Sequence, residues 1–262
     1  MAYAKIKYEQ QGAVAVVTMN DPATLNAISV EMTDEMSDAF ARAASEARCI
    51  VLTGEGRAFS SGANLASGAP PMDAEGRPDL GGRLEATFNP FVNMLRELPI
   101  PFVTAVNGAA AGIGCSFALL GDLIVASESA YFLEAFRRIG LVPDGSATYH
   151  LPRMTTRARA MEMMLLGDKI AAAKALEWGL INRCVPDAEL MPATMTIAAE
   201  LANGPTRTLG MIRKLGWASL DAAWSEQLLA ERNAQREAGR TEDFREGVQA
   251  FFQKRPPNFK GT

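Results

Sequence analysis

The sequence contains one histidine, His150, and three cysteines among its 262 residues. One histidine excludes a metal site built on two histidine ligands and makes any histidine-based triad depend on that residue. The cysteines, at positions 49, 115 and 184, are odd in number and lack metal-site spacing, so we expect free thiols in a reducing compartment. We therefore expect neither a disulfide scaffold nor a bound metal.

Three widespread motifs are also absent. Gly54 and Gly56 lack the third glycine of a G-x-G-x-x-G fingerprint at the required spacing. The sequence has no G-x-x-x-x-G-K-[ST] phosphate loop, and the Ser60-Ser61-Gly62 stretch does not make a G-x-S-x-G nucleophile elbow. Nucleotide-dependent and serine-hydrolase chemistry are therefore disfavoured.

The chain lacks an excess of positive charge, with 26 Lys and Arg against 30 Asp and Glu. A nucleic-acid partner is disfavoured, because phosphate binding needs a basic surface.

The uncharged residues 98–121 could span a bilayer by length, but their prolines and four glycines favour a buried strand, turn and helix. The first ten residues have no apolar run, so we expect no secretory signal, no membrane partner and a cytoplasmic location.

The composition, 48% hydrophobic and 21% charged, is typical of one large globular unit. Strands and helices alternate in the first half, which favours parallel crossovers, and the second half is mainly helical. The expected strands are two runs within 6–19, then 49–53, 102–106 and 123–127, and a long loop covers 56–82. The expected helices begin at Ser29 and near Ile113 and cover 84–97, 146–151, 156–166, 171–179, 187–203, 206–217, 220–238 and 241–254.

Two glycine-bearing turns, residues 56–65 and 107–116, each follow a buried strand. Small residues let backbone amides approach a ligand, and an amide at a helix start adds the positive end of the helix dipole. Two such turns side by side can direct two N–H groups at one oxygen, as in an oxyanion hole. The alternative is that the glycines only permit close packing, and periodicity alone favours that alternative.

The motifs around these turns resemble those of the crotonase (enoyl-CoA hydratase/isomerase) superfamily, in the same order along nearly the whole chain. The shared segments are Asn26-Ala27, residues 58–65, 105–108, 121–126, 140–145, 175–180 and 250–255. The resemblance implies an α/β fold: a spiral of repeated ββα units over residues 1–200, carrying an acyl-CoA site. It also implies a C-terminal helical region over residues 201–262 that packs into homotrimers, often paired into hexamers.

The implied ligand is an acyl-CoA thioester, with coenzyme A arriving as part of the substrate and no permanently bound cofactor. By position, the two amides of the hole would be those of Ala63 and Ile113. Most relatives have Gly or Ala at the second place, so we expect the branched side chain of Ile113 to narrow the pocket. Gly112, Ser116 and Phe136 would line the acyl pocket.

Hydratases of this family use two glutamates, which would stand where this chain has Ser116 and Phe136. Hydration needs one group to activate water and another to deliver a proton. Neither a serine nor a phenylalanine side chain is a useful acid or base here, so the ordinary hydratase mechanism is disfavoured.

Asp144 is the remaining candidate acid or base. By spacing alone, Pro143-Asp144-Gly145 is typical of a turn or a helix cap. The resemblance assigns this position the acid of some enoyl-CoA isomerases and of ring-epoxide isomerases of phenylacetate breakdown. We therefore predict an acyl-CoA isomerase, of the enoyl-CoA or epoxyphenylacetyl-CoA type, that uses Asp144 in an apolar pocket where its pKa is raised.

Three alternatives stay open from the sequence. The protein could be an enoyl-CoA hydratase that works with one atypical acid. It could also be a hydrolase or dehalogenase with Asp144 as nucleophile, since Asp144 matches the nucleophilic aspartate of 4-chlorobenzoyl-CoA dehalogenases. That chemistry needs a base, for which His150 is poorly placed by sequence. The third alternative is a non-catalytic acyl-CoA-binding protein.

The resemblance also implies contacts to coenzyme A beyond the thioester. The implied residues are Ser61, Asn64 and Leu65 near the first turn, and Phe251 and Lys254, often from a neighbouring subunit. Thr24-Leu25 stands where relatives often have a basic residue, so one phosphate contact is missing. The loop 66–82 and the helix around Phe88 and Phe91 either line the acyl end or belong to the core.

Overall fold

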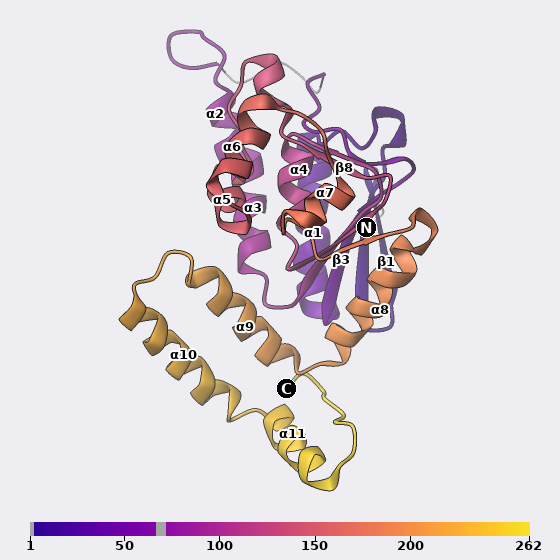
Figure 1. Ribbon diagram of the computed structural model, residues 1–262, viewed down its shortest axis with the longest axis vertical. Helices are drawn as coiled ribbons and strands as arrows, with labels where there is room; N and C mark the ends of the chain where they lie inside the picture. Colours follow the sequence, from indigo (N-terminus) through magenta and orange to yellow (C-terminus); the bar gives the residue numbers. More distant parts are fainter. Residues whose placement is uncertain (1–2, 67–71) are drawn as a thin grey trace.

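The computed structural model describes residues 3–66 and 72–262. Its larger layer is a six-stranded sheet with the strand order β1-β2-β3-β5-β7-β10 (Figure 1). These strands are Ile6–Gln11 (β1), Val14–Met19 (β2), Cys49–Gly54 (β3), Phe102–Val106 (β5), Leu123–Ser127 (β7) and Arg183–Val185 (β10). The smaller sheet has the order β4-β6-β8-β9, with strands Ala58–Ser60 (β4), Ala109–Ala111 (β6), Tyr131–Leu133 (β8) and Ile170–Ala171 (β9).

The two sheets are built by one repeated connection. Each of β3, β5 and β7 is followed by a short strand of the smaller sheet, β4, β6 and β8. Neighbouring strands along this series are parallel in both sheets. β3 is buried along its whole length, as expected for a parallel strand covered on both faces. The predicted spiral of ββα units is confirmed.

Helices cover the sheets and complete the turns of the spiral. They are Val30–Glu46 (α1), Leu80–Arg83 (α2), Asn89–Glu97 (α3), Ile113–Ala118 (α4), Ala147–Met154 (α5), Arg157–Leu166 (α6), Ala172–Glu177 (α7), Leu190–Asn203 (α8), Thr206–Ala218 (α9), Trp224–Ala238 (α10) and Glu242–Gln253 (α11). The prediction that Ser29 begins a helix is confirmed, because its Oγ caps α1 by accepting a hydrogen bond from the Met32 amide at 3.1 Å.

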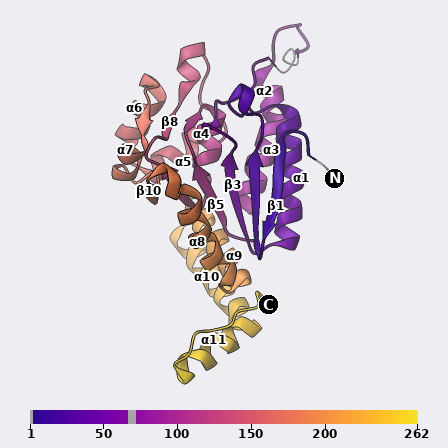
Figure 2. The ribbon, with the colours of Figure 1, turned by 90° about the vertical axis from the view of Figure 1, so that its right-hand side faces the viewer.

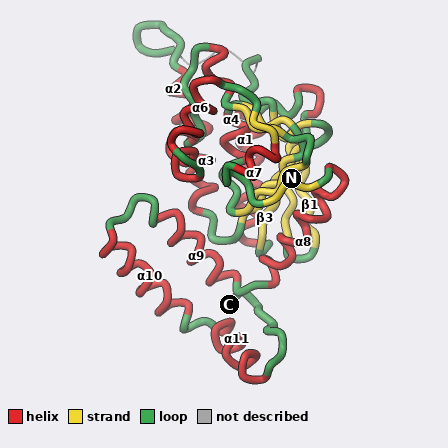
Figure 3. Tube along the Cα trace, viewed as in Figure 1, coloured by secondary structure: helices red, strands yellow, loops and turns green. Residues whose placement is uncertain are grey.

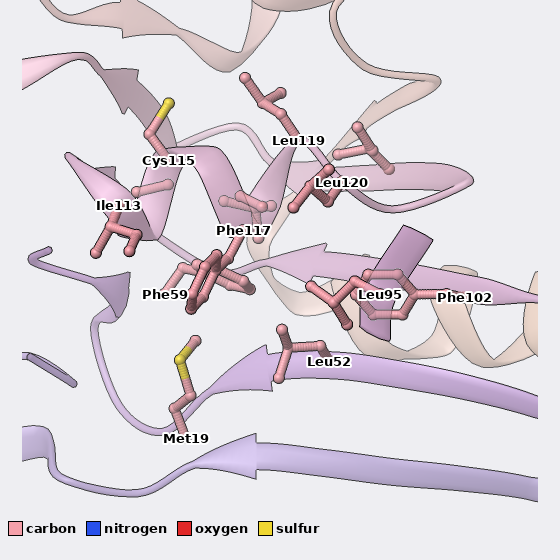
Figure 4. Close-up of a cluster of buried hydrophobic side chains, with 14 of the residues drawn as sticks. Met19, Leu52, Phe59, Leu95, Phe102, Ile113, Cys115, Phe117, Leu119 and Leu120 are labelled. Atoms are coloured by element: carbon pink, nitrogen blue, oxygen red, sulfur yellow. The ribbon is translucent and has the colours of Figure 1, made fainter. Parts of the chain in front are cut away.

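Aromatic side chains fix the helices to the larger sheet. The ring of Phe40 on α1 lies edge-to-face against Phe91 of α3 and Phe102 of β5, with centroids 5.5 Å and 5.3 Å apart. Phe91 also packs against Phe117 of α4, and Figure 4 shows Phe117 next to Phe59 of β4. Phe91 therefore belongs to the core rather than to an acyl pocket, and this core lies directly beneath α4.

The C-terminal part of the chain contains only helices and loops beyond α8 (Figure 3). α9 docks on the spiral, where Arg213 pairs with Asp122 at 2.7 Å and donates to the carbonyl of Leu98. α10 and α11 extend away from the spiral in both views (Figures 1 and 2). The helical C-terminal region is confirmed. The division at residue 200 falls inside α8 and stays a prediction.

Several boundaries differ from the sequence-based expectation. The helix expected over 84–97 begins at Leu80 and passes through a π-helical turn, Leu84–Phe88. The helices expected from 187 and 220 begin at Leu190 and Trp224, and α5 continues to Met154. The short strands β4, β6 and β8 were not predicted, because three residues are too few to show a period.

Among the described residues, no helix has the length and apolar character that a membrane span requires.

Replacing Phe40 with alanine removes a fully buried ring that contacts two others. The resulting cavity should lower the free energy of unfolding by about 3–5 kcal/mol. Leu166→Ala, at a residue that is 51% exposed, is the control and should change it by less than about 0.5 kcal/mol. Denaturant titration measures both values, and equal effects of the two substitutions would contradict this description of the core.

Candidate active site

The first glycine-bearing turn is held from behind by Asn26, a buried residue in the left-handed region with φ 55°. Its Nδ2 donates to the carbonyl oxygens of Glu55 and Ala58, at 3.0 Å and 2.8 Å. Ser60 Oγ donates back to the Asn26 carbonyl at 2.8 Å, and the Ser61 amide donates to another carbonyl of the same loop. These bonds fix the path of residues 60–62.

The amide of Ala63 points out of this turn. The Ile28 amide donates to the carbonyl of Gly62, and the Asn64 amide donates to the carbonyl of Ile28, both at 2.8 Å. In such a parallel bridge the residue between the two bonded neighbours turns its own N–H away from the partner strand. Ala63 is exposed, and its N–H has no backbone acceptor among the residues that the structure describes, so it is available to a ligand.

The second turn ends in Gly112, whose φ of 52° and ψ of −131° are open only to glycine. The Gly112 amide donates to the carbonyl of Leu133 at 2.8 Å, which ties the turn to β8. Ile113 is the first residue of α4, so its N–H has no partner within the helix. Within the described part of the chain its N–H has no backbone acceptor either, so it is the second candidate donor.

The two turns touch through their glycines. A Cβ placed on Gly62, which has φ 104°, would lie 3.0 Å from the carbonyl oxygen of Ala111. A Cβ placed on Gly112 would lie 3.8 Å from Gly62 Cα. Both positions have a positive φ, and the space at Gly62 is also tight, so the backbone conformation favours glycine at each. The structure thus brings together the turns that carry Ala63 and Ile113.

Asp144 is attached to α4 beside the second turn. Ser116 Oγ donates to the Asp144 carbonyl oxygen at 2.8 Å. Gly145, with φ 59°, lies so close to α4 that a Cβ on it would be 2.7 Å from Ser116 Cβ and 3.2 Å from Ile113 Cγ1. Ser116, which stands at the place of a hydratase glutamate, therefore holds the Asp144 loop instead.

The carboxyl group of Asp144 lies in a largely apolar environment. Its Oδ1 is buried and has no hydrogen-bond partner within residues 3–66 and 72–262. Burial raises the pKa of Asp144 to about 6. The ring of Phe136 lies beside the second turn, since its Cζ is 3.8 Å from the Cβ position of Gly112. A half-buried carboxylate of this kind can accept and return a proton near neutral pH.

The side chain of Ile113 is buried in the core (Figure 4), and its Cγ1 lies 3.2 Å from the Cβ position of Gly145. It therefore packs beneath the Asp144 loop. Its effect on the width of the acyl pocket stays a prediction.

A second buried carboxyl, Glu134, was not identified from the sequence. It follows β8 directly, is fully buried, and neither carboxyl oxygen has a hydrogen-bond partner in the described part of the chain. Burial raises the pKa of Glu134 to about 8; the Cys115 thiol opposes this rise, and the charge of Asp144 adds a smaller increase. Its position two residues before Phe136, in the segment that resembles a hydratase active site, was the signal available.

His150 lies on α5 and is buried. Its Nδ1 shares a 3.1 Å hydrogen bond with Ser146 Oγ. Burial lowers the pKa of His150 to about 4, so its ring is neutral at physiological pH.

The expected coenzyme A residues fall into two groups. Ser61, Asn64 and Leu65 lie at the first turn, and Leu65 is 71% exposed. Phe251 and Lys254 lie at the end of α11, far from α4 in both views (Figures 1 and 2). One chain does not bring the two groups together. Part of the loop expected to line the acyl end, residues 67–71, lies outside the described residues.

The described residues contain no group of three or more His, Cys, Asp or Glu side chains arranged to hold a metal ion. The chemical groups gathered at the candidate site are two backbone amides, one half-buried carboxylate and one fully buried carboxyl. Amides directed at one oxygen stabilise developing negative charge, and the carboxylate can move a proton beside it.

Comparison with known proteins identifies the family of this chain. The sequence profile described as enoyl-CoA hydratase/isomerase matches residues 9–262. A Rhodobacter capsulatus protein named "Probable enoyl-CoA hydratase" is 44% identical over 261 residues, covering 100% of both chains. The 1,2-epoxyphenylacetyl-CoA isomerase of Escherichia coli is 41% identical over 251 residues, covering 95% of each.

Solved structures give the same result for the fold. The crystal structure of an enoyl-CoA hydratase from Bacillus anthracis superimposes with a TM-score of 0.90 at 26% identity, covering 99% of this chain and 100% of that one. The chain therefore belongs to the enoyl-CoA hydratase/isomerase family, within the crotonase superfamily.

Proposed function

We propose that this protein is an acyl-CoA isomerase that binds the thioester oxygen with the amides of Ala63 and Ile113 and moves a proton with Asp144. The observation that carries the proposal is Asp144 itself, a carboxylate with a free buried oxygen, fastened to α4 beside the hole. The similarity to an epoxyphenylacetyl-CoA isomerase supports the same reading.

The reaction follows from the position of these groups. The two amides polarise the thioester carbonyl, which acidifies the neighbouring C–H bond. The Asp144 carboxylate takes that proton, the C–H electron pair moves into the dienolate, and the oxygen anion is stabilised by both amides. The conjugate acid of Asp144 then returns the proton further along the acyl chain, so the double bond moves without a change in mass. With an epoxide substrate, the same acid would assist ring opening.

We further propose that coenzyme A is held partly by a second copy of the chain in a homotrimer or hexamer. Phe251 and Phe252 on α11 are 79% and 77% exposed, and Trp224 at the start of α10 is 81% exposed. Large apolar side chains exposed on neighbouring helices are typical of an interface. A neighbouring copy that covers this face would also bring Phe251 and Lys254 to a substrate bound at the hole.

A cytoplasmic location accords with an acyl-CoA substrate.

A hydratase is the second candidate, and the 44% identical relative with that name favours it. Hydration would need Asp144 to work with an atypical partner, because Ser116 and Phe136 replace the expected glutamates. The two reactions differ in mass, since hydration adds one water to the substrate.

Asp144→Asn should abolish isomerisation while leaving acyl-CoA binding intact. Loss of a general acid/base should lower kcat by about 10²–10⁴-fold. The assay follows a trans-3-enoyl-CoA, a trans-2-enoyl-CoA and 1,2-epoxyphenylacetyl-CoA by ultraviolet absorbance and mass spectrometry. A mass gain of one water on the 2-enoyl substrate, with little isomer formed, would instead identify a hydratase.

The activity should depend on the ionisation of Asp144. Because the carboxylate form takes the proton and the pKa of Asp144 is raised to about 6, kcat/KM should rise with pH through that value. Below it, the rate should fall by about tenfold per pH unit as Asp144 becomes protonated. A rate that stays level down to pH 4 would show that Asp144 is not the base.

Gly112→Ala tests the hole itself. A Cβ at φ 52° and ψ −131° strains the backbone that aims the Ile113 amide. Loss of one such donor should lower kcat by about 10²–10³-fold. Gly140→Ala is the matched control, because Gly140 also has a positive φ, 73°, but open space around its Cβ position. Equal losses in the two variants would indicate general destabilisation rather than damage to the hole.

A further inference from the structure

Glu134 lies in a sealed position next to the candidate site. It immediately follows Leu133, whose carbonyl accepts the hydrogen bond from Gly112 that fixes the second turn. The Glu134 side chain is 0% exposed, and both of its carboxyl oxygens are buried without a hydrogen-bond partner among the described residues. The proposed reaction does not use this carboxyl.

No cation in the described part of the chain forms an ion pair with Glu134. The nearest positive charges on its own segment, Arg137 and Arg138, donate instead to the carbonyls of Leu166 and Gly167. The titratable groups that interact with Glu134 are Cys115, from α4, and Asp144, from the following loop. Both of these neighbours become negative when they ionise.

An ionised carboxylate without hydrogen bonds or a cation is strongly disfavoured in an apolar interior, so Glu134 keeps its proton. Asp144, which is less buried and keeps part of its solvation, ionises first. The pKa values follow this order, about 8 for Glu134 and about 6 for Asp144. Two carboxyl groups whose pKa values are driven apart in this way are typical of an acid and a base in one site.

We infer that Glu134 is a positioning residue: as a buried neutral acid it confines the site's negative charge to Asp144 and leaves the oxyanion hole free of a competing charge. When Glu134 loses its proton, a second negative charge appears in the interior, where it interacts with the charge of Asp144. That charge opposes formation of the dienolate anion. The effect on turnover rests on the proposed function, whereas the protonation of Glu134 does not.

The first measurement is the melting temperature of wild type and Glu134→Gln between pH 5 and pH 9. The pKa of Glu134 is raised when folded, to about 8, above the roughly 4.3 of a free glutamate. The folded chain therefore holds a proton that the unfolded chain loses, and wild-type stability declines as pH rises toward 8. Glutamine cannot ionise, so Tm of the variant relative to wild type should increase with pH up to about 8 and then level off.

Glu162→Gln, at an exposed residue of α6, is the matched control and should follow wild type at every pH. Should Glu134→Gln not fold, Glu134→Met keeps a similar volume without an ionisable group. Parallel Tm curves for wild type and either Glu134 variant would overturn the assignment of a neutral buried acid.

The second measurement is the pH profile of kcat/KM for isomerisation. Wild type should lose activity by about tenfold per unit above pH 8, and Glu134→Gln should retain its rate there. Superimposable alkaline limbs would overturn the positioning role. Absence of isomerisation in wild type, together with the expected Tm difference, would contradict the proposed function and leave the neutral acid established.

Discussion

The close approach of the two turns at Gly62 and Gly112 is the constraint on which the proposed site depends. Each glycine has a positive φ, and a Cβ on Gly62 would lie only 3.0 Å from the Ala111 carbonyl oxygen, so a side chain there would press the turns apart. Asn26 fixes the first turn from behind, and the Leu133 carbonyl fixes the second. The spiral places these turns at neighbouring strand ends, and the aromatic core beneath α4 keeps them there.

The distribution of carboxyl groups around this contact determines the chemistry. An oxyanion hole directs the positive ends of two N–H dipoles at one oxygen atom. An effective base must lie next to that oxygen and have a pKa near neutral. Asp144 meets both conditions because its loop is fastened to α4 by Ser116 and its carboxyl is partly desolvated. Ser116, where the family resemblance implies a hydratase glutamate, holds the Asp144 loop. We propose that this difference favours an isomerase over a hydratase within one fold.

Much of this could be predicted from the sequence, for identifiable reasons. The buried strands β3, β5 and β7 and the cap at Ser29 have strong local patterns, and the two glycine turns are visible as small-residue runs. The three-residue strands β4, β6 and β8 have no period and depend on tertiary pairing. The burial of Glu134 could not be predicted from its local sequence, because its neighbours Cys115 and Asp144 belong to other segments, α4 and the Asp144 loop. The separation of Phe251 and Lys254 from the hole likewise depends on how α9 to α11 leave the spiral.

The most direct measurement is a crystal structure of the protein with a non-reactive acyl-CoA thioester, in which the position of the thioester oxygen is determined. We predict that this oxygen lies within hydrogen-bond distance, about 2.7–3.2 Å, of both the Ala63 and the Ile113 nitrogen atoms, with the Asp144 carboxylate beside the acyl chain. A thioester oxygen bound elsewhere, with these two amides facing solvent or another part of the ligand, would contradict the account.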